Sequence, residues 1–286
     1  MLAKRTLGLR ASRLISAALA YAFLLAGSAL MLIPFYWLVT TSLKTVPQVL
    51  KFPPEWIPNP VTLQAYRGIF AFYPWIVYIR NTLFIVVVVL IGQLLSSMIV
   101  AYGFAFFRFR GREVIFFVLL STMMLPAVVR IVPLYVAYSK LGWVHTFLPL
   151  TLPAYFGSAF YIFLLRQFFR TIPSELFDAA TIDGCSELGI LFRIIAPLSR
   201  TALAVIALFS FQHSWDDFMH PLIYLQESSK YTMALGVWSL HSAPDGTISV
   251  PQVMAGACLM VVPVIILFAL FQRYFIEGIA LTGMKG

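Results

Sequence analysis

Acidic side chains are scarce in this sequence, and several of them fall in one short segment. Residues 175–198 (ELFDAATIDGCSELGILFRIIAPL) hold four of the 11 acidic residues of the 286-residue chain. The four are Glu175, Asp178, Asp183 and Glu187. Carboxylates in the first turns of a helix are stabilised by the helix dipole. The segment therefore predicts helices whose ends are capped or anchored by these carboxylates. Carboxylates not used in this way would be available to contact another molecule.

Local signals in the same segment predict two short helices that meet at an angle. Pro173 suits the first position of a helix. Gly184 interrupts the helical run and permits a left-handed turn. A second helix is expected over 186–195, and Pro197 is expected to begin the next long helix.

Small and apolar residues on these two helices indicate contact with another surface. Ala179, Ala180 and Gly184 would let a neighbouring backbone approach closely. Six apolar side chains cannot all face water, namely Leu176, Phe177, Ile182, Leu188, Leu191 and Phe192. They fit either docking into a partner protein or an amphipathic loop that lies on a membrane surface.

The composition places these helices in a membrane protein. Hydrophobic residues make up 61% of the chain and charged residues 11%, whereas a soluble domain carries about 25% charged residues. The net charge of +9 comes from basic residues between apolar stretches, so we expect no nucleic-acid partner.

Six apolar stretches predict an all-α integral membrane protein with six transmembrane helices. A helix needs about 20 apolar residues to cross the hydrocarbon core. Four uncharged stretches are long enough and two are shorter: 14–43, 81–107, 141–165 and 246–272, then 114–129 and 201–215. The third helix must run past Arg130 to reach full length, and the fifth must run past Asp216 and Asp217.

Basic residues predict the orientation of these helices. If residues 1–13 are a cytoplasmic tail, 13 of the 20 basic residues fall on inner segments, as the positive-inside rule requires. Both termini are then cytoplasmic, as is the loop over about 167–198, between the fourth and fifth helices. The proline-rich outer segment 44–76 is expected to hold a short helix over 62–71. Cys185 and Cys258 are not expected to form a disulfide.

Polar groups within or beside the spans are candidates for a solute path. They are Gln93, Ser96, Ser97, Arg130, Asp216 and Asp217. Ionisable groups at membrane depth are costly and often functional. The charged groups also suit snorkelling to the interface, and the polar ones suit bonds between helices. His213 and His220 share a helix face, but no third ligand converges to form a metal site.

The acidic segment resembles the EAA loop of bacterial ABC-importer permeases, which continues as D-G-A and ends near L-P. The matching positions are Glu175, Asp178, Ala179, Ala180, Asp183, Gly184 and Pro197. Two positions depart from the pattern, because Asp178 stands where Glu is usual and Cys185 stands where Ala is usual.

Four further stretches resemble the carbohydrate branch of this family, which is related to the maltose-system permeases. They are AYGFAFFRFRGR at 101–112, the run from Met124 to Pro133, Trp215 to Phe218 in place of W-N-D-F, and the terminal EGIALTGMKG at 277–286. The segment NTLFIVVVVL at 81–90 is similar to the start of its second span.

The resemblance implies a permease subunit whose transmembrane domain covers 14–286, in a bacterial cytoplasmic membrane. Its implied partners are a second permease subunit, an ATPase dimer and an extracytoplasmic solute-binding protein. The chain has no Walker A motif, so ATP and Mg²⁺ would bind to the ATPase and this chain needs no cofactor. Residues 173–193 would form the coupling helix, and its six ATPase-coupling residues would be Glu175, Asp178, Ala179, Ala180, Asp183 and Gly184. Asp178 and Asp183 would anchor the helix, and a bulky residue at Gly184 would uncouple ATP hydrolysis from uptake.

Other functions remain open at this level. A glycerol-3-phosphate permease is closely similar to the carbohydrate branch. An ion-coupled secondary transporter would show internal repeats, and the long inner loop would be unexplained. An intramembrane enzyme needs paired catalytic groups, but adjacent Asp216 and Asp217 point different ways on a helix. A receptor or scaffold would move no solute. The solute itself cannot be read from the sequence.

Overall fold

A computed structural model describes residues 2–240 and 249–283, and side chains over 14–240 and 249–272. Helices and turns form all the regular structure of these residues. The chain divides into two compact units: residues up to 73 with 240–259, and residues 74–239 with 260 onward. The prediction of a single transmembrane domain over 14–286 stays a prediction.

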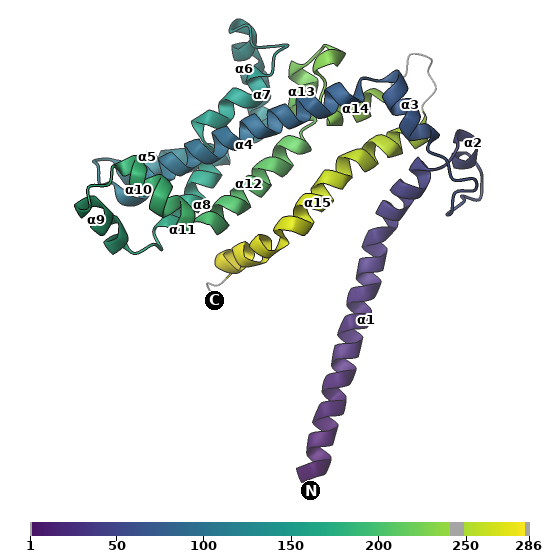
Figure 1. Ribbon diagram of the computed structural model, residues 1–286, viewed down its shortest axis with the longest axis horizontal. Helices are drawn as coiled ribbons and strands as arrows, with labels where there is room; N and C mark the ends of the chain where they lie inside the picture. Colours follow the sequence, from purple (N-terminus) through teal and green to yellow (C-terminus); the bar gives the residue numbers. More distant parts are fainter. Residues whose placement is uncertain (1, 241–248, 284–286) are drawn as a thin grey trace. The chain divides into compact units, whose positions relative to one another are not determined.

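The first unit contains α1 (Leu2–Ser42), α2 (Val46–Val49) and α3 (Gln64–Phe72) (Figure 1). Helix α1 includes the predicted tail over 1–13, apart from residue 1, which lies outside the described residues. Every residue of α1 from 14 to 36 is exposed. Such a continuous apolar surface suits lipid or another membrane protein.

Polar contacts hold the end of α1 inside the first unit. The Ser42 hydroxyl lies 2.9 Å from the Tyr66 hydroxyl, and the Cys258 thiol lies 3.8 Å from Ser42. Lys44 is buried, and its ammonium lies 4.1 Å from the centre of the Trp37 ring. Burial lowers the pKa of Lys44, although the charge of Glu55 acts in the opposite direction.

Cys185 and Cys258 are both free thiols.

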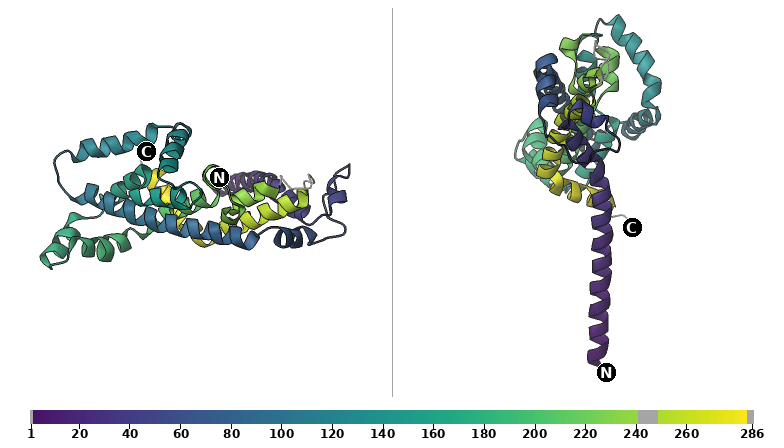
Figure 2. Two further views of the ribbon diagram at one scale, coloured as in Figure 1. Left: turned by 90° about the horizontal axis from the view of Figure 1, so that it is seen from above. Right: turned by 90° about the vertical axis from the view of Figure 1, so that its right-hand side faces the viewer.

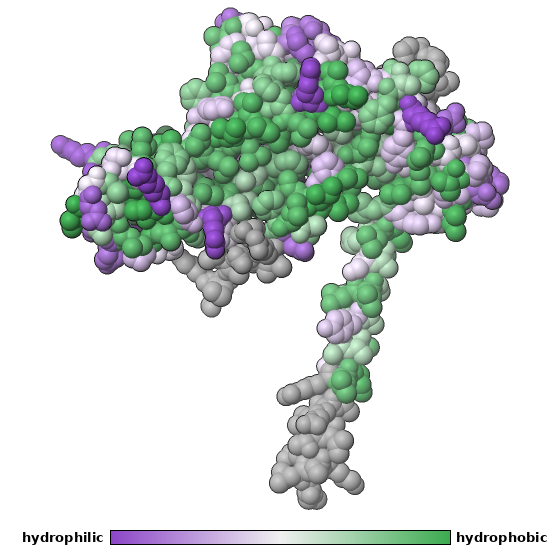
Figure 3. All heavy atoms as spheres, viewed as in Figure 1, coloured by the Kyte–Doolittle hydropathy of each residue, from purple (hydrophilic) through white to green (hydrophobic). Residues whose placement is uncertain are grey.

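Three long helices pack side by side in the second unit: α4 (Trp75–Phe106), α8 (Ala159–Phe169) and α12 (Arg200–Trp215) (Figure 1). Helix α4 begins six residues before the expected start at Asn81. Glycine lets it approach its neighbours closely, because a Cβ on Gly92 would lie 2.6 Å from the Tyr155 ring. Apolar side chains cover the middle of α4 and α12 on the face shown in Figure 3.

The third predicted helix is divided by a bend, and its second part contains Arg130. Helix α5 (Arg112–Ser121) continues as a 3-10 turn over Thr122–Met124, and α6 (Ala127–Lys140) then departs at 98° (Figure 2). Pro126 precedes α6, and a proline both lacks an amide donor and restricts the residue before it. Arg130 therefore lies on α6, beyond the bend.

The fourth and fifth predicted helices also differ from the expectation. The fourth span runs from Leu148 to Phe169 instead of 141–165. It comprises α7 (Leu148–Thr151), a 3-10 turn (Leu152–Phe156) and α8, with Gly157 at φ +78° between the last two. Helix α12 begins at Arg200, after an 84° bend from the preceding Glu187–Leu198 segment, and ends at Trp215. Asp216 follows the helix, so the fifth helix does not run past Asp216 and Asp217.

The remaining helices are α13 (Met219–Tyr224), a 3-10 turn (Ser228–Lys230), α14 (Met233–Ser239) and α15 (Val250–Gly283). Four helical segments among the described residues are long and apolar enough to cross a membrane, and the two bent pairs bring the number to six if each is one span. The all-α membrane fold is therefore confirmed, with four to six spans.

Candidate coupling loop and polar interior

The first predicted helix of the acidic segment is α9 (Ser174–Ile182), and Gly184 ends it. The Gly184 amide donates to the Thr181 carbonyl at 3.1 Å, and the Cys185 amide donates to the Ala180 carbonyl at 3.0 Å. This pair of bonds is the Schellman motif, which requires a left-handed residue after the helix. Gly184 supplies it with φ +78°. A Cβ at Gly184 would meet nothing within 4 Å, so conformation explains this glycine within the chain.

The second predicted helix, over 186–195, contains two kinds of turn. Helix α10 (Glu187–Ile190) is capped by the Ser186 hydroxyl, which accepts the Gly189 amide at 3.2 Å. A π-helical turn follows over Leu191–Ile195, and α11 (Ala196–Leu198) completes the segment. The long helix expected to begin at Pro197 begins three residues later, at Arg200.

One face of this loop is part of the core of the second unit. Ile190, Leu191 and Ile195 are fully buried, and Ala180 is 5% exposed. They belong to a cluster with residues of α4, α5, α8 and α12, including Ala101, Phe116, Leu165 and Ile206. Ala180 is therefore small because it packs within the chain, whereas its neighbour Ala179 is exposed.

Two specific contacts join the loop to the end of α4. The Phe177 and Phe106 rings stack with centroids 5.3 Å apart and planes 10° apart. The Tyr102 hydroxyl donates to the Glu187 carboxylate at 2.9 Å. Offset stacking of this kind adds to the energy of area burial. The loop is thus packed against α4, and a displacement of α9 or α10 acts on that helix directly.

The opposite face of the loop is exposed. It carries five of the six predicted coupling residues, which are Glu175, Asp178, Ala179, Asp183 and Gly184. Among the described side chains, no hydrogen bond or ion pair involves Asp178 or Asp183, so their predicted anchoring role stays a prediction. Four of the six apolar side chains singled out in the sequence share this exposure, with Leu176 at 43%, Phe192 at 45%, Leu188 at 60% and Ile182 at 86%.

An ion pair beside the loop, between buried Arg166 and exposed Glu113, was not predicted from the sequence. The Arg166 guanidinium donates to both Glu113 carboxylate oxygens at 2.8 and 3.0 Å and to the Phe104 carbonyl at 3.2 Å. It also lies 4.0 Å from the centre of the Phe116 ring. The sequence counts Arg166 only as an inner basic residue. The available signal is Glu113, an acid beside three arginines at the start of a predicted helix.

Gln93 and Ser97 lie in the packed interior of the second unit. Gln93 is 8% exposed and Ser97 is fully buried. The Gln93 amide donates to the Ser97 hydroxyl at 3.0 Å, one turn along α4. Nearby, the Ser96 hydroxyl donates to the Ala154 carbonyl at 2.9 Å, which is a bond between segments.

Arg130, Asp216 and Asp217 belong to a different part of the second unit from Gln93 and Ser97, because Arg130 lies in the first turn of α6 and the two aspartates follow the end of α12. Arg130 and Asp216 are exposed and Asp217 is half-buried. The Asp217 carboxylate oxygens both lie 3.0 Å from His220 Nδ1, and this contact raises the pKa of His220. The positive charge of Arg130 opposes that increase, which places Arg130 within electrostatic reach of the pair.

The described residues contain no metal site, because no group of three or more His, Cys, Asp or Glu side chains is arranged to hold an ion. Among the described residues, His213 and His220 do not converge with a third ligand.

The fold, the exposed loop and the buried polar groups define a membrane transport subunit. Residues 93–280 match the family described as binding-protein-dependent transport system inner membrane component. The chain belongs to this family. It is therefore a multi-pass membrane component of a transport system that works with a binding protein, and not itself an enzyme.

Curated relatives support the same family. The chain is 34% identical over 233 residues to the arabinooligosaccharides transport system permease protein AraQ of Halalkalibacterium halodurans, covering 80% of this chain and 81% of AraQ. It is 30% identical over 277 residues to the sn-glycerol-3-phosphate transport system permease protein UgpE of Brucella abortus, covering 94% and 98%.

A solved structure has the same fold. It is a chain of a bacterial ABC transporter involved in the import of the acidic polysaccharide alginate, with a TM-score of 0.79 and 24% identity, covering 90% of this chain and 96% of that one.

Proposed function

We propose that this chain is the permease subunit of an ATP-driven importer that moves a carbohydrate, either a sugar or an oligosaccharide, into a bacterial cell. The names of AraQ and of the alginate transporter support a carbohydrate as the solute class. A second permease subunit, an ATPase dimer and an extracytoplasmic binding protein would complete the transporter. Both termini and the 167–198 loop would face the cytoplasm, and the ATPase would hold ATP and Mg²⁺.

The main support for the coupling role is that the 167–198 loop is buried on one side and exposed on the other. One side is fully buried at Ile190, Leu191 and Ile195, so the loop moves as part of the second unit. The other side exposes carboxylates and large apolar side chains together. Exposed apolar groups rimmed by polar ones are typical of protein interaction sites. The ATPase would bind this face and drive the spans as rigid elements, giving alternating access.

Ile182 offers the sharpest test, because it is the most exposed large apolar side chain of the loop, at 86%. Ile182→Lys should abolish most co-purification of the ATPase with the transporter and reduce uptake at least tenfold, without changing the melting temperature of the chain. Leu50→Lys is the matched control, since Leu50 is 77% exposed and lies in the segment after α2. Equal ATPase recovery for the two variants would rule out docking through this face.

Ala179 and Ala180 separate contact with the partner from internal packing. Ala179→Leu should weaken ATPase binding and leave the thermal stability of the chain unchanged, because Ala179 is exposed. Ala180→Leu should instead lower stability by about 1–3 kcal/mol, because added volume in a packed core forces strain. Identical behaviour of the two variants would contradict this division.

Gly184 needs a conformational control. At φ +78°, a bulky residue is strained as well as large, so Gly184→Trp alone confounds the two effects. Asparagine adopts left-handed conformations more readily than most residues. Gly184→Asn should therefore keep more coupled transport than Gly184→Val. Equal loss in both would favour a partner surface that tolerates no side chain here.

A solute path past Arg130, Asp216 and Asp217 is part of this proposal, with Gln93 and Ser97 deeper along α4. Its support is the gathering of Arg130, Asp217 and His220 in one region, with charges that remain partly accessible. Neutral replacements Arg130→Gln and Asp217→Asn should change the apparent affinity for solute if this region lines the path. Unchanged uptake kinetics in both variants would assign these groups to the interface alone.

A glycerol-3-phosphate importer is the second candidate, favoured by the UgpE relatives, which match nearly the whole chain. Ligand identification on the associated binding protein distinguishes the candidates. A bound sugar or oligosaccharide supports the carbohydrate assignment, and bound glycerol-3-phosphate replaces it.

A further inference from the structure

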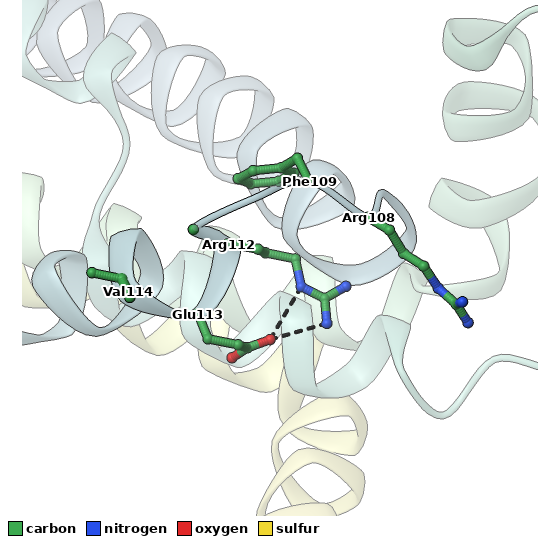
Figure 4. A pocket seen from close by; sticks show the side chains of 6 residues that line it. Arg108, Phe109, Arg112, Glu113 and Val114 are labelled. Atoms are coloured by element: carbon green, nitrogen blue, oxygen red, sulfur yellow. Dashed lines mark hydrogen bonds and ion pairs between the residues drawn. The ribbon is translucent and has the colours of Figure 1, made fainter.

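A hollow of about 380 Å³ lies beside the short turn that joins α4 to α5. Its lining residues are Arg108, Phe109, Gly111, Arg112, Glu113 and Val114 (Figure 4). None of them belongs to the 167–198 loop, so the coupling role proposed above does not account for this feature.

The hollow carries more positive than negative charge. Its one carboxylate, Glu113, is already bonded to Arg112, with Nη2–Oε1 at 3.0 Å, and to Arg166. Arg108 is exposed and forms no ion pair with any described residue. Its side chain extends away from Glu113 in Figure 4, while Arg112 points toward it. An anion in the hollow would therefore meet Arg108 without displacing the internal pairs.

The backbone adds to this positive character. Gly111 has φ +84° and directly precedes α5, a helix of ten residues. The first amide groups of a helix lack intrahelical partners, and they carry partial positive charge. In α5 the Arg112 amide donates to the Phe109 carbonyl at 3.3 Å, so the open amides are those of Glu113 and Val114, before the first intrahelical bond from Ile115 to Gly111. A Cβ on Gly111 would meet nothing within 4 Å, so the space beside this helix start is open. Phosphate groups bind at such positions because amides and charge act together.

The position of the hollow identifies the source of the anion. Helix α4 is a candidate membrane span up to Phe106, and the next span begins at Arg112. A turn of five residues between two spans stays close to the membrane surface, where lipid phosphates lie. Two apolar side chains flank the arginines, with Phe109 44% exposed and Val114 68% exposed. The hollow thus offers a charged part for a headgroup and an apolar border for the attached chains.

We propose that this hollow binds the headgroup phosphate of an anionic phospholipid. The Arg108 guanidinium contacts the phosphate oxygens, the open amides of α5 contribute hydrogen bonds, and Arg112 stays paired with Glu113 while adding positive potential. The lipid's acyl chains lie along Val114. The site holds a structural lipid next to the core that anchors the loop, because Arg166 bonds to the same Glu113.

Native mass spectrometry of the full transporter, purified in a mild detergent and titrated with phosphatidylglycerol or phosphatidylcholine, tests this site. The wild type should retain phosphatidylglycerol preferentially. Arg108→Gln should lower that retention about fivefold, as expected for one basic residue at an anionic surface, and Arg108→Lys should keep most of it. Arg170→Gln is the matched control, because Arg170 is an exposed arginine after α8 that does not line the hollow.

Four outcomes would overturn the proposal. Equal retention of the two lipids would remove the preference for an anionic headgroup. An equal loss in Arg108→Gln and Arg170→Gln would reduce it to general surface charge. Competition by millimolar inorganic phosphate, with no lipid retained, would assign the hollow to a free ion. If Arg108→Gln lowers ATPase recovery and leaves lipid retention unchanged, the hollow contacts protein. The coupling proposal is unaffected by these results, since Ile182 tests it independently.

Discussion

Both ends of α4 pack aromatic side chains, but the polar contacts beside that packing differ. At the end near the 167–198 loop, Tyr102 and Phe106 pack against apolar and aromatic neighbours, and Arg166 bonds to a backbone carbonyl. At the other end, the Asn81 amide donates to the carbonyls of Ser229 and Tyr231, both at 3.0 Å. There the Thr82 hydroxyl also accepts the Met233 amide at 2.8 Å.

From this difference we expect the loop end to transmit movement and the Asn81 end to fix geometry. Apolar packing is dense but has no preferred direction, so the loop end moves as one body with α9 and α10. Hydrogen bonds from a side chain to the backbone lose strength steeply as their geometry changes. The Asn81 end therefore holds the segment before α14 in one register against α4. Removing a contact at each end separates the two roles.

The largest effect is expected from Arg166, which joins the aromatic core to the ion pair. Arg166→Ala removes a buried side chain and its bond to the Phe104 carbonyl, whereas the Glu113 side chain is 63% exposed, so its ion pair is screened by water and contributes less. The melting temperature of the detergent-purified chain should fall by about 4–8 °C. Arg166→Lys should rescue only part of the loss, since lysine lacks the planar donor fork.

Arg170→Ala is the control for this comparison, because Arg170 follows the same helix and is exposed. Its melting temperature should stay close to that of the wild type. An equal decrease in the two alanine variants would mean that the Arg166 contacts add no stability.

A smaller effect is expected at the opposite end of α4. Thr82→Val keeps the shape of the side chain but removes the acceptor for the Met233 amide, so a buried donor loses its partner. The expected cost is about 1–3 kcal/mol. Hydrogen exchange at Met233 should accelerate, while exchange in α9 stays unchanged. Thr82→Ser keeps the hydroxyl and should preserve protection, and loss of protection there as well would point to packing.

The smallest effect concerns the Asp217–His220 pair. Its contact raises the pKa of His220, so stabilisation by the charged pair is complete below the ordinary histidine value of 6.5. The stabilisation is lost as the pH rises through the raised folded-state pKa. The side chains are 41% and 20% exposed, which keeps the contribution below about 1 kcal/mol. The melting temperature of His220→Gln should differ from the wild type by about 2 °C at pH 5.5 and by less at pH 8.5. A difference that grows with pH would contradict this sign.

Much of the loop end follows from local sequence. The start of α9 was predicted from Pro173, its helical character from the alanines and its end from Gly184. These predictions are correct because caps and glycine turns depend on residues that are neighbours in the sequence. The short outer helix, expected over 62–71, is α3 at Gln64–Phe72. Local pattern also gave the apolar spans, because their length is set by the membrane.

Local sequence did not predict features that depend on distant partners. The Arg166–Glu113 contact joins residues 53 positions apart, and Asn81 binds carbonyls about 150 positions away. Hydropathy alone extended the fifth helix past Asp216, although α12 ends at Trp215, and it did not register the bends at Pro126 and near Ser199. Ala180 was assigned to a partner surface because a small residue looks the same in sequence whether it packs inward or outward.

The π-helical turn at Leu191–Ile195 changes how the loop can vary. Each α-helical residue rotates the chain by about 100°, so in a regular helix residues 190 and 195 would point about 140° apart. The wider turn carries an i→i+5 bond and brings both isoleucines inward, where both are fully buried. The turn thus acts as a spacer one residue long. Deleting one residue from this turn would restore the α-helical periodicity. The exposed face of the loop before the turn would then rotate away from the orientation proposed for ATPase binding.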